Sequence, residues 1–94
     1  MLLNFTTNTT SSSYSSKGSS INVVASGTWG GATMAVQVLD PEDGSWVTVY
    51  SATADTSKNL LIGSGMAYRI NISGGTAQDI DVHVMNVQSK DLNL

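Results

Sequence analysis

From residue 20 to residue 87, apolar and polar side chains alternate with a period of two, and Gly, Asp and Asn bound the alternating segments. This alternation is typical of β-strands with one buried face, and no window shows the stripe of an amphipathic helix. Turn signals spaced roughly 8 to 12 residues apart favour an all-β fold, a small antiparallel β-sandwich of Greek-key or jelly-roll-like type. The predicted strands cover residues 20–26, 32–39, 45–51, 59–62, 66–73 and 79–87.

The same alternation assigns side chains to faces, because successive residues of a strand point to opposite sides of the sheet. The predicted core is the apolar set Ile21, Val23, Ala25, Met34, Val36, Val38, Tyr68, Ile70, Ile72, Ile80, Val82 and Val84. The opposite faces are polar and carry Asn22, Gln37, Arg69, Asn71, Asp79, Asp81 and His83.

The third predicted strand is ambiguous, because both of its faces carry apolar side chains. Val47 and Val49 alternate with Trp46 and Tyr50, and on a regular strand the two rings share one face about 13 Å apart. Such a pair could stack sugars, as in carbohydrate-binding modules, but strand aromatics pack more often in a core or between subunits. We expect Trp46 and Tyr50 to do the latter.

The N-terminal segment has a different composition. Residues 6–20 hold eleven Ser or Thr, which bury too little apolar surface to offset the entropy of ordering. Three apolar residues precede this run and favour docking on a partner, although a short edge strand of the same domain would look identical. The expected parts are an extended N-terminal arm or linker over 1–19, a β-sandwich domain over 20–88 and a C-terminal tail over 89–94. The candidate interface residues are Leu2, Leu3, Phe5, Trp46 and Tyr50.

Composition narrows the classes of partner. A chain of 94 residues predicts one domain, and a formal charge of −3 gives no basic face for nucleic acid. The chain has no cysteine and a single histidine, His83. No stretch approaches the roughly 18 apolar residues of a membrane span, and the start lacks the basic region of a secretory signal. We therefore expect no nucleic-acid partner, no membrane partner, and synthesis in the cytoplasm.

The residues offer little catalytic or metal chemistry. Asp79, Asp81 and His83 alternate on one strand face, where steps of about 6.6 Å keep three side chains from converging on one ion. Residues 40–44 lack the ligand spacing of a calcium loop and fit a hairpin turn better. No nucleophile elbow accompanies the lone histidine. The sequence predicts no catalytic residue, no metal site and no cofactor, so we expect a protein that is not an enzyme.

Several short motifs follow one another in the central part of the chain. They are Gly-Thr-Trp-Gly-Gly-Ala-Thr at 27–33, Val-Gln-Val at 36–38, Asp-Gly-Ser-Trp at 43–46, Gly-x-x-Tyr-Arg at 65–69 and Ser-Gly at 73–74. Over residues 25–84, about two thirds of the chain, the sequence resembles small β-sandwich virion structural proteins of tailed bacteriophages, of the head decoration, cement or fibre type.

This resemblance implies a function in the virion. A capsid decoration or cement protein would bind and stabilise the assembled head, with the major capsid protein or another virion protein as partner. It would be made in the host cytoplasm and act as a homo-oligomer, with a homotrimer expected. The alternative is a tail or head fibre component, or a carbohydrate-binding module that contacts host glycans. The resemblance carries over no catalytic or binding residue.

Overall fold

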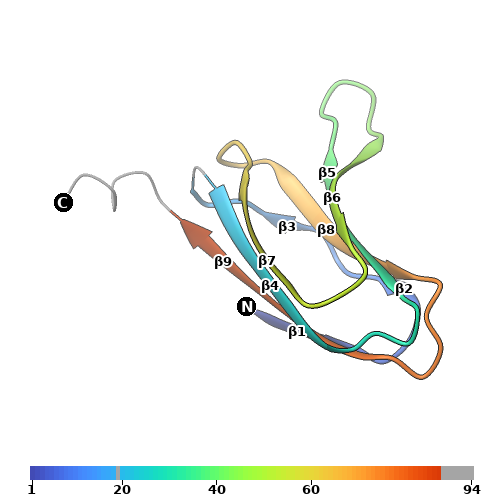
Figure 1. Ribbon diagram of the computed structural model, residues 1–94. Helices are drawn as coiled ribbons and strands as arrows, with labels where there is room; N and C mark the ends of the chain where they lie inside the picture. The colour runs from blue at the N-terminus through green and yellow to red at the C-terminus, as the bar shows by residue number, and fades with distance from the viewer. Residues whose placement is uncertain (19, 88–94) are drawn as a thin grey trace.

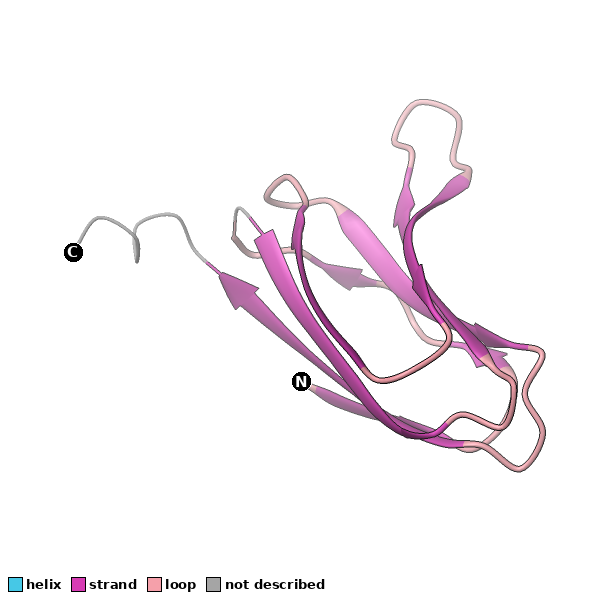
Figure 2. Ribbon diagram, viewed as in Figure 1, coloured by secondary structure: helices cyan, strands magenta, loops and turns pink. Residues whose placement is uncertain are grey.

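The computed structural model describes residues 1–18 and 20–87, which form two antiparallel β-sheets packed face to face (Figure 1, Figure 2). The first sheet has the order β1-β9-β4-β7, with β1 at Leu2–Phe5, β9 at Asp79–Val87, β4 at Ser20–Thr28 and β7 at Thr56–Leu61. The second sheet has the order β2-β8-β5-β6, with β2 at Thr9–Thr10, β8 at Ala67–Ser73, β5 at Thr33–Leu39 and β6 at Trp46–Ala52. A further short strand, β3 at Tyr14–Ser15, also pairs with β8. Within the described residues no helix is long and apolar enough to cross a membrane.

The predicted all-β sandwich is confirmed. When β2 and β3 are counted as two parts of one interrupted strand, the order of strands in the two sheets is that of a jelly roll. The six predicted strands correspond to β4 through β9. The largest shift is in β7, which begins at Thr56 instead of residue 59. Residues 56–58 pair with β4 through their backbone. The alternation of apolar side chains does not reveal such pairing, so the sequence missed these residues.

The core lies between the sheets and contains the predicted apolar set. Eleven of those twelve side chains are buried, and Val38 is half-buried near the end of β5. Further buried apolar residues are Phe5, Ala32, Leu60 and Ile62. Period-two alternation therefore identified the inward faces of β4, β5, β8 and β9 correctly.

The predicted N-terminal arm is wrong for residues 2–15, because this segment supplies strands to both sheets. In β1, Leu3 pairs with Val82 and Phe5 with Ile80, and the Phe5 side chain is only 5% exposed. The chain then crosses to the second sheet, where β2 and β3 pair with β8. Backbone hydrogen bonds to β8 therefore order this polar run, although the run forms no core of its own. The alternative, a short edge strand of the same domain, is correct for β1. The predicted C-terminal tail, residues 89–94, lies outside the described residues.

Two glycines let backbone segments approach at the end of the sandwich where β4 turns into β5. Gly27 has a φ of 136°, and a Cβ there would lie 2.2 Å from the Asp79 carbonyl oxygen. Gly30 has a φ of 55°, and a Cβ would lie 2.1 Å from the Thr76 carbonyl oxygen. The Thr76 amide donates to the Gly30 carbonyl at 3.0 Å. The Gly-Thr-Trp-Gly-Gly motif therefore serves close backbone packing.

We expect Phe5→Ala to lower the free energy of unfolding by roughly 3–5 kcal/mol, because it removes a large core side chain. Leu2→Ala is the matched control in the same strand. The Leu2 side chain is 58% exposed, so its truncation should change stability by less than about 0.5 kcal/mol. Urea unfolding measures both. Equally small losses in the two variants would show that β1 is not part of the folded domain.

We expect Gly27→Ala to destabilise the fold by at least about 2 kcal/mol, because the new methyl group meets backbone that cannot move away alone. Gly44 provides the comparison. It also has a positive φ, 77°, but a Cβ added there would meet nothing within 4 Å. Gly44→Ala should therefore cost only about 1 kcal/mol, the conformational penalty of the left-handed region. A Gly27→Ala variant as stable as Gly44→Ala would contradict the close approach.

Candidate binding surfaces

The five predicted interface residues do not form one surface. Leu2 is exposed on the outer face of the first sheet, whereas Leu3 packs partly against the core. Phe5 is a core residue, so its assignment to an interface is wrong. Trp46 and Tyr50 are both half-buried on β6, in the other sheet.

Trp46 and Tyr50 do not share a face, which corrects the prediction from the sequence. Tyr50 pairs with the core residue Val36, but Thr48 pairs with Gln37, so the register shifts at this point. The residue between them, Val49, is the extra residue of a β-bulge, and a bulge reverses the alternation of faces beyond it. Tyr50 therefore lies on the inner face and Trp46 on the outer face, and the two rings form no common platform.

Tyr50 joins the two sheets along the side of the sandwich where β6 and β7 are the edge strands. Its hydroxyl is hydrogen-bonded to the Thr56 hydroxyl on β7. The Lys58 ammonium, also on β7, lies 5.9 Å from the centre of the Tyr50 ring. A charged side chain on the inner face of an edge strand also disfavours pairing with another strand. Tyr50 thus packs against the core, one of the two roles expected for it.

Trp46 lies beside Arg69 on the outer face of the second sheet. The guanidinium carbon is 4.2 Å from the centre of the indole ring, within the range of a cation–π interaction. Arg69 Nε donates to Gln37 Oε1 at 2.8 Å, and Gln37 Nε2 donates to Thr48 Oγ1 at 3.3 Å. We call these four residues the Arg69 platform. The sequence predicts Gln37 and Arg69 on a polar face, but the bulge is needed to bring Trp46 and Thr48 to that face.

The β5–β6 hairpin extends beyond the rest of the sandwich (Figure 1). The last residue of β5 that pairs with β8 is Val38, and Leu39 pairs only with Trp46. Val47 and Val49 are 47% and 44% exposed on this hairpin. The second sheet therefore presents a protruding element with uncovered apolar side chains.

The tip of the hairpin is the acidic turn, residues 40–45, and it was predicted correctly as a turn. The Gly44 amide donates to the Asp40 carbonyl at 2.9 Å, and the Asp40 amide donates to the Ser45 carbonyl at 2.7 Å. Asp40 Oδ1 accepts from the Glu42 amide. The Ser45 hydroxyl and amide both donate to Asp43, and these bonds lower the pKa of the Asp43 carboxyl. Two of the three acids thus stabilise the turn itself.

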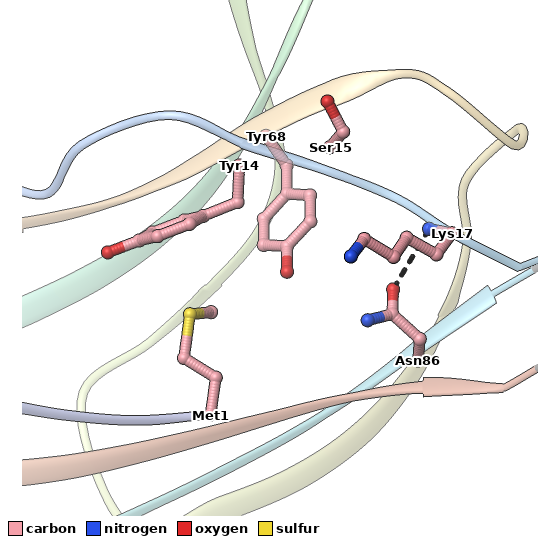
Figure 3. A pocket seen from close by; sticks show the side chains of 6 residues that line it. All are labelled: Met1, Tyr14, Ser15, Lys17, Tyr68 and Asn86. Carbon is pink, nitrogen blue, oxygen red and sulfur yellow. Dashed lines mark hydrogen bonds between the residues drawn. The ribbon is translucent and has the colours of Figure 1, made fainter.

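A cavity of about 210 Å³ opens at the end of the sandwich near the start of β8 (Figure 3). The side chains that line it are Met1, Tyr14, Ser15, Lys17, Tyr68 and Asn86. The Tyr68 hydroxyl points into the space, and Asn86 Oδ1 accepts a hydrogen bond from the Lys17 amide at 3.1 Å. The cavity has room for a few water molecules or a small polar ligand.

Asp79, Asp81 and His83 are exposed on β9, as the alternation predicts. The Asn4 side-chain amide lies between the carboxylates, with Nδ2 donating to Asp79 Oδ1 at 2.7 Å and to Asp81 Oδ1 at 2.8 Å. His83 pairs with Leu2 across the strands, away from that contact. Among the described residues, no group of three or more His, Cys, Asp or Glu side chains is arranged to hold a metal ion.

The Trp29 side chain is held in place by Asp55. Its indole Nε1 donates to Asp55 Oδ1 at 2.8 Å, and the Gly27 amide donates to the same oxygen at 3.1 Å. Asp55 thus ties the turn after β6 to the end of β4, and Trp29 packs partly against the core.

Comparisons with protein-family models, with curated proteins and with solved structures found nothing that matches this chain. Membership of the family that the sequence motifs resemble is therefore a proposal.

We expect the stability of the protein to decrease as the pH rises past about 10, and Tyr68 to contribute to that loss. Burial, together with the charge of neighbouring Tyr14, raises the pKa of the Tyr68 phenol above its ordinary value. The folded state then holds the proton more tightly than the unfolded state, so stability is intact below the unfolded pKa and falls above it. Thermal melts of Tyr68→Phe should show a weaker decrease with pH, whereas Tyr14→Phe should retain most of it. An unchanged pH profile in Tyr68→Phe would contradict this assignment.

Proposed function

We propose that this protein is a bacteriophage virion structural protein that decorates the assembled head. Its main support is the resemblance over residues 25–84 to small virion β-sandwich proteins. The jelly-roll order of strands is compatible with it, because jelly rolls recur in viral capsid domains, though also in lectins.

The protruding hairpin is the single structural observation that favours an adhesive role. Val47 and Val49 lie on an element that the other described residues leave uncovered. Exposed apolar side chains grouped on one element are typical of protein contact sites. In this proposal the protein acts as a homo-oligomer, a trimer by the resemblance, and binds the major capsid protein or another virion protein without performing catalysis.

The structure does not place the two aromatic residues of β6 as glycan binding through both rings would require. The platform considered for sugars consisted of two rings on one face, whereas Trp46 and Tyr50 lie on opposite faces of β6. One side of the indole is also occupied by Arg69. We therefore favour head decoration over a carbohydrate-binding module.

We expect purified virions of the phage that encodes this chain to contain it on their heads. Mass spectrometry of the particles and immunogold electron microscopy test this directly. Added protein should bind heads that lack it and should raise their thermal stability. Absence from virions would overturn the proposal, and labelling confined to the tail would favour a fibre component instead.

The double variant Val47→Ser/Val49→Ser should bind such heads at least tenfold more weakly, because it removes apolar contact area without emptying the core. Leu61→Ser is the matched control, since Leu61 is 88% exposed at the end of β7 in the other sheet. Sedimentation of protein with heads measures binding, and thermal melts check that both variants fold. Equal binding by the double variant and the wild type would exclude the hairpin as the attachment element.

A further inference from the structure

Arg69 is half-buried, yet no ion pair to it is found among the described residues. The chain is acidic, with seven Asp or Glu against four Lys or Arg, so carboxylates are plentiful. Partial burial of a guanidinium removes hydration that its own chain only partly replaces. The contacts that Arg69 does make are with Trp46 and Gln37, and both restrict its orientation.

The Arg69 platform has the features of a carboxylate receptor. A guanidinium carries five N–H donors in one plane, and the contact with Gln37 uses only the Nε donor. The remaining donors match the two oxygens of a carboxylate, which gives a short, charge-assisted pair of hydrogen bonds. Because Trp46 already holds the guanidinium in place, less side-chain entropy is lost when a carboxylate binds.

The acidic turn carries a carboxylate suited to this receptor. Asp40 and Asp43 accept hydrogen bonds within the turn, whereas Glu42 is exposed and its carboxylate has no hydrogen-bond partner among the described residues. The turn of the same chain is badly placed to supply it. Arg69 lies opposite Gln37, and each further residue of β5 toward the tip lies about 3.3 Å farther along the strand from Arg69. A carboxylate from the turn of another copy is not limited in this way.

We propose that the acidic turn of one copy docks on the Arg69 platform of a second copy, with the Glu42 carboxylate bound by the Arg69 guanidinium. Half-buried Leu39 and Trp46 pair with each other on the same outer face and supply apolar contact beside the charges. Interfaces commonly combine an aromatic or Arg anchor with polar contacts at the rim.

The turn and the platform are different patches, so the contact is heterologous and repeats head to tail, closing a ring when the rotation between copies allows it. Three copies would give the trimer of the proposed function. The inference rests on the self-association in that proposal but not on the virion. Measurements on the isolated protein therefore test it separately from binding to heads.

The experiment is a charge swap measured by analytical ultracentrifugation of the full chain at about 0.15 M salt. Arg69→Glu and Glu42→Arg should each weaken self-association at least tenfold, because each places like charges in the contact. The double variant Arg69→Glu/Glu42→Arg should restore association to within about threefold of the wild type. Ser57→Arg is the control, since it adds a positive charge at an exposed position on β7.

A second measurement covers the case in which the double variant does not fold. Labelled Glu42→Arg protein should bind Arg69→Glu protein more tightly than either variant binds itself, because the mixture contains both complementary pairs. Thermal melts verify that each single variant is folded. A wild-type protein that stays monomeric at all concentrations, single variants that associate like the wild type, or a mixture that shows no binding would each overturn the proposed contact. Any of these results would leave attachment to heads through Val47 and Val49 untouched.

Discussion

Two strands inside the sheets, β9 and β8, need hydrogen-bond partners along both edges, and this requirement governs the architecture. β9 and β8 each contribute three side chains to the core, and each has a neighbouring strand from the predicted sandwich on only one side. The N-terminal segment completes both, because β1 pairs with β9 and the chain then crosses to place β2 and β3 on β8. The Ser11 amide donates to the Ile70 carbonyl, and the Ile70 amide donates to the Ser11 hydroxyl. Phe5 fixes β1 through apolar burial, whereas the polar residues around β2 are held mainly by backbone pairing with β8.

The opposite side of the sandwich is closed by a different device. There the chain crosses from β6 to β7, and side chains connect the two edge strands, with Tyr50 bonded to Thr56 and covered by Lys58. This closure depends on the bulge at Val49, which directs Tyr50 inward. The same bulge directs Trp46 outward, onto Arg69. One extra residue in β6 thus produces both a contact between the sheets and a surface platform.

The sequence predicts the parts of this fold that depend on alternation within a single strand. The burial of Ile21, Val36 and Ile80 could be predicted because each belongs to an unbroken period-two run. Alternation says nothing about which strand pairs with which. It therefore missed that Phe5 packs against the core, since the short apolar start looks the same as an arm and as an edge strand. It also placed Trp46 and Tyr50 on one face, because a bulge leaves no mark in a run of β-branched and aromatic residues.

The β5–β6 hairpin differs from the other strand connections in what supports it. Beyond Val38, β5 has no partner in β8, so the tip is held by the β5–β6 ladder and by hydrogen bonds of Asp40, Asp43 and Gly44 within the turn. An isolated two-stranded hairpin is only marginally stable in water. Anchoring its base through the Arg69–Gln37–Thr48 chain and the Trp46 contact lets it project while the sandwich remains folded. The residues that stabilise the hairpin are thus the same ones that shape the platform at its base, so a contact made there by another molecule would also stiffen the projecting element.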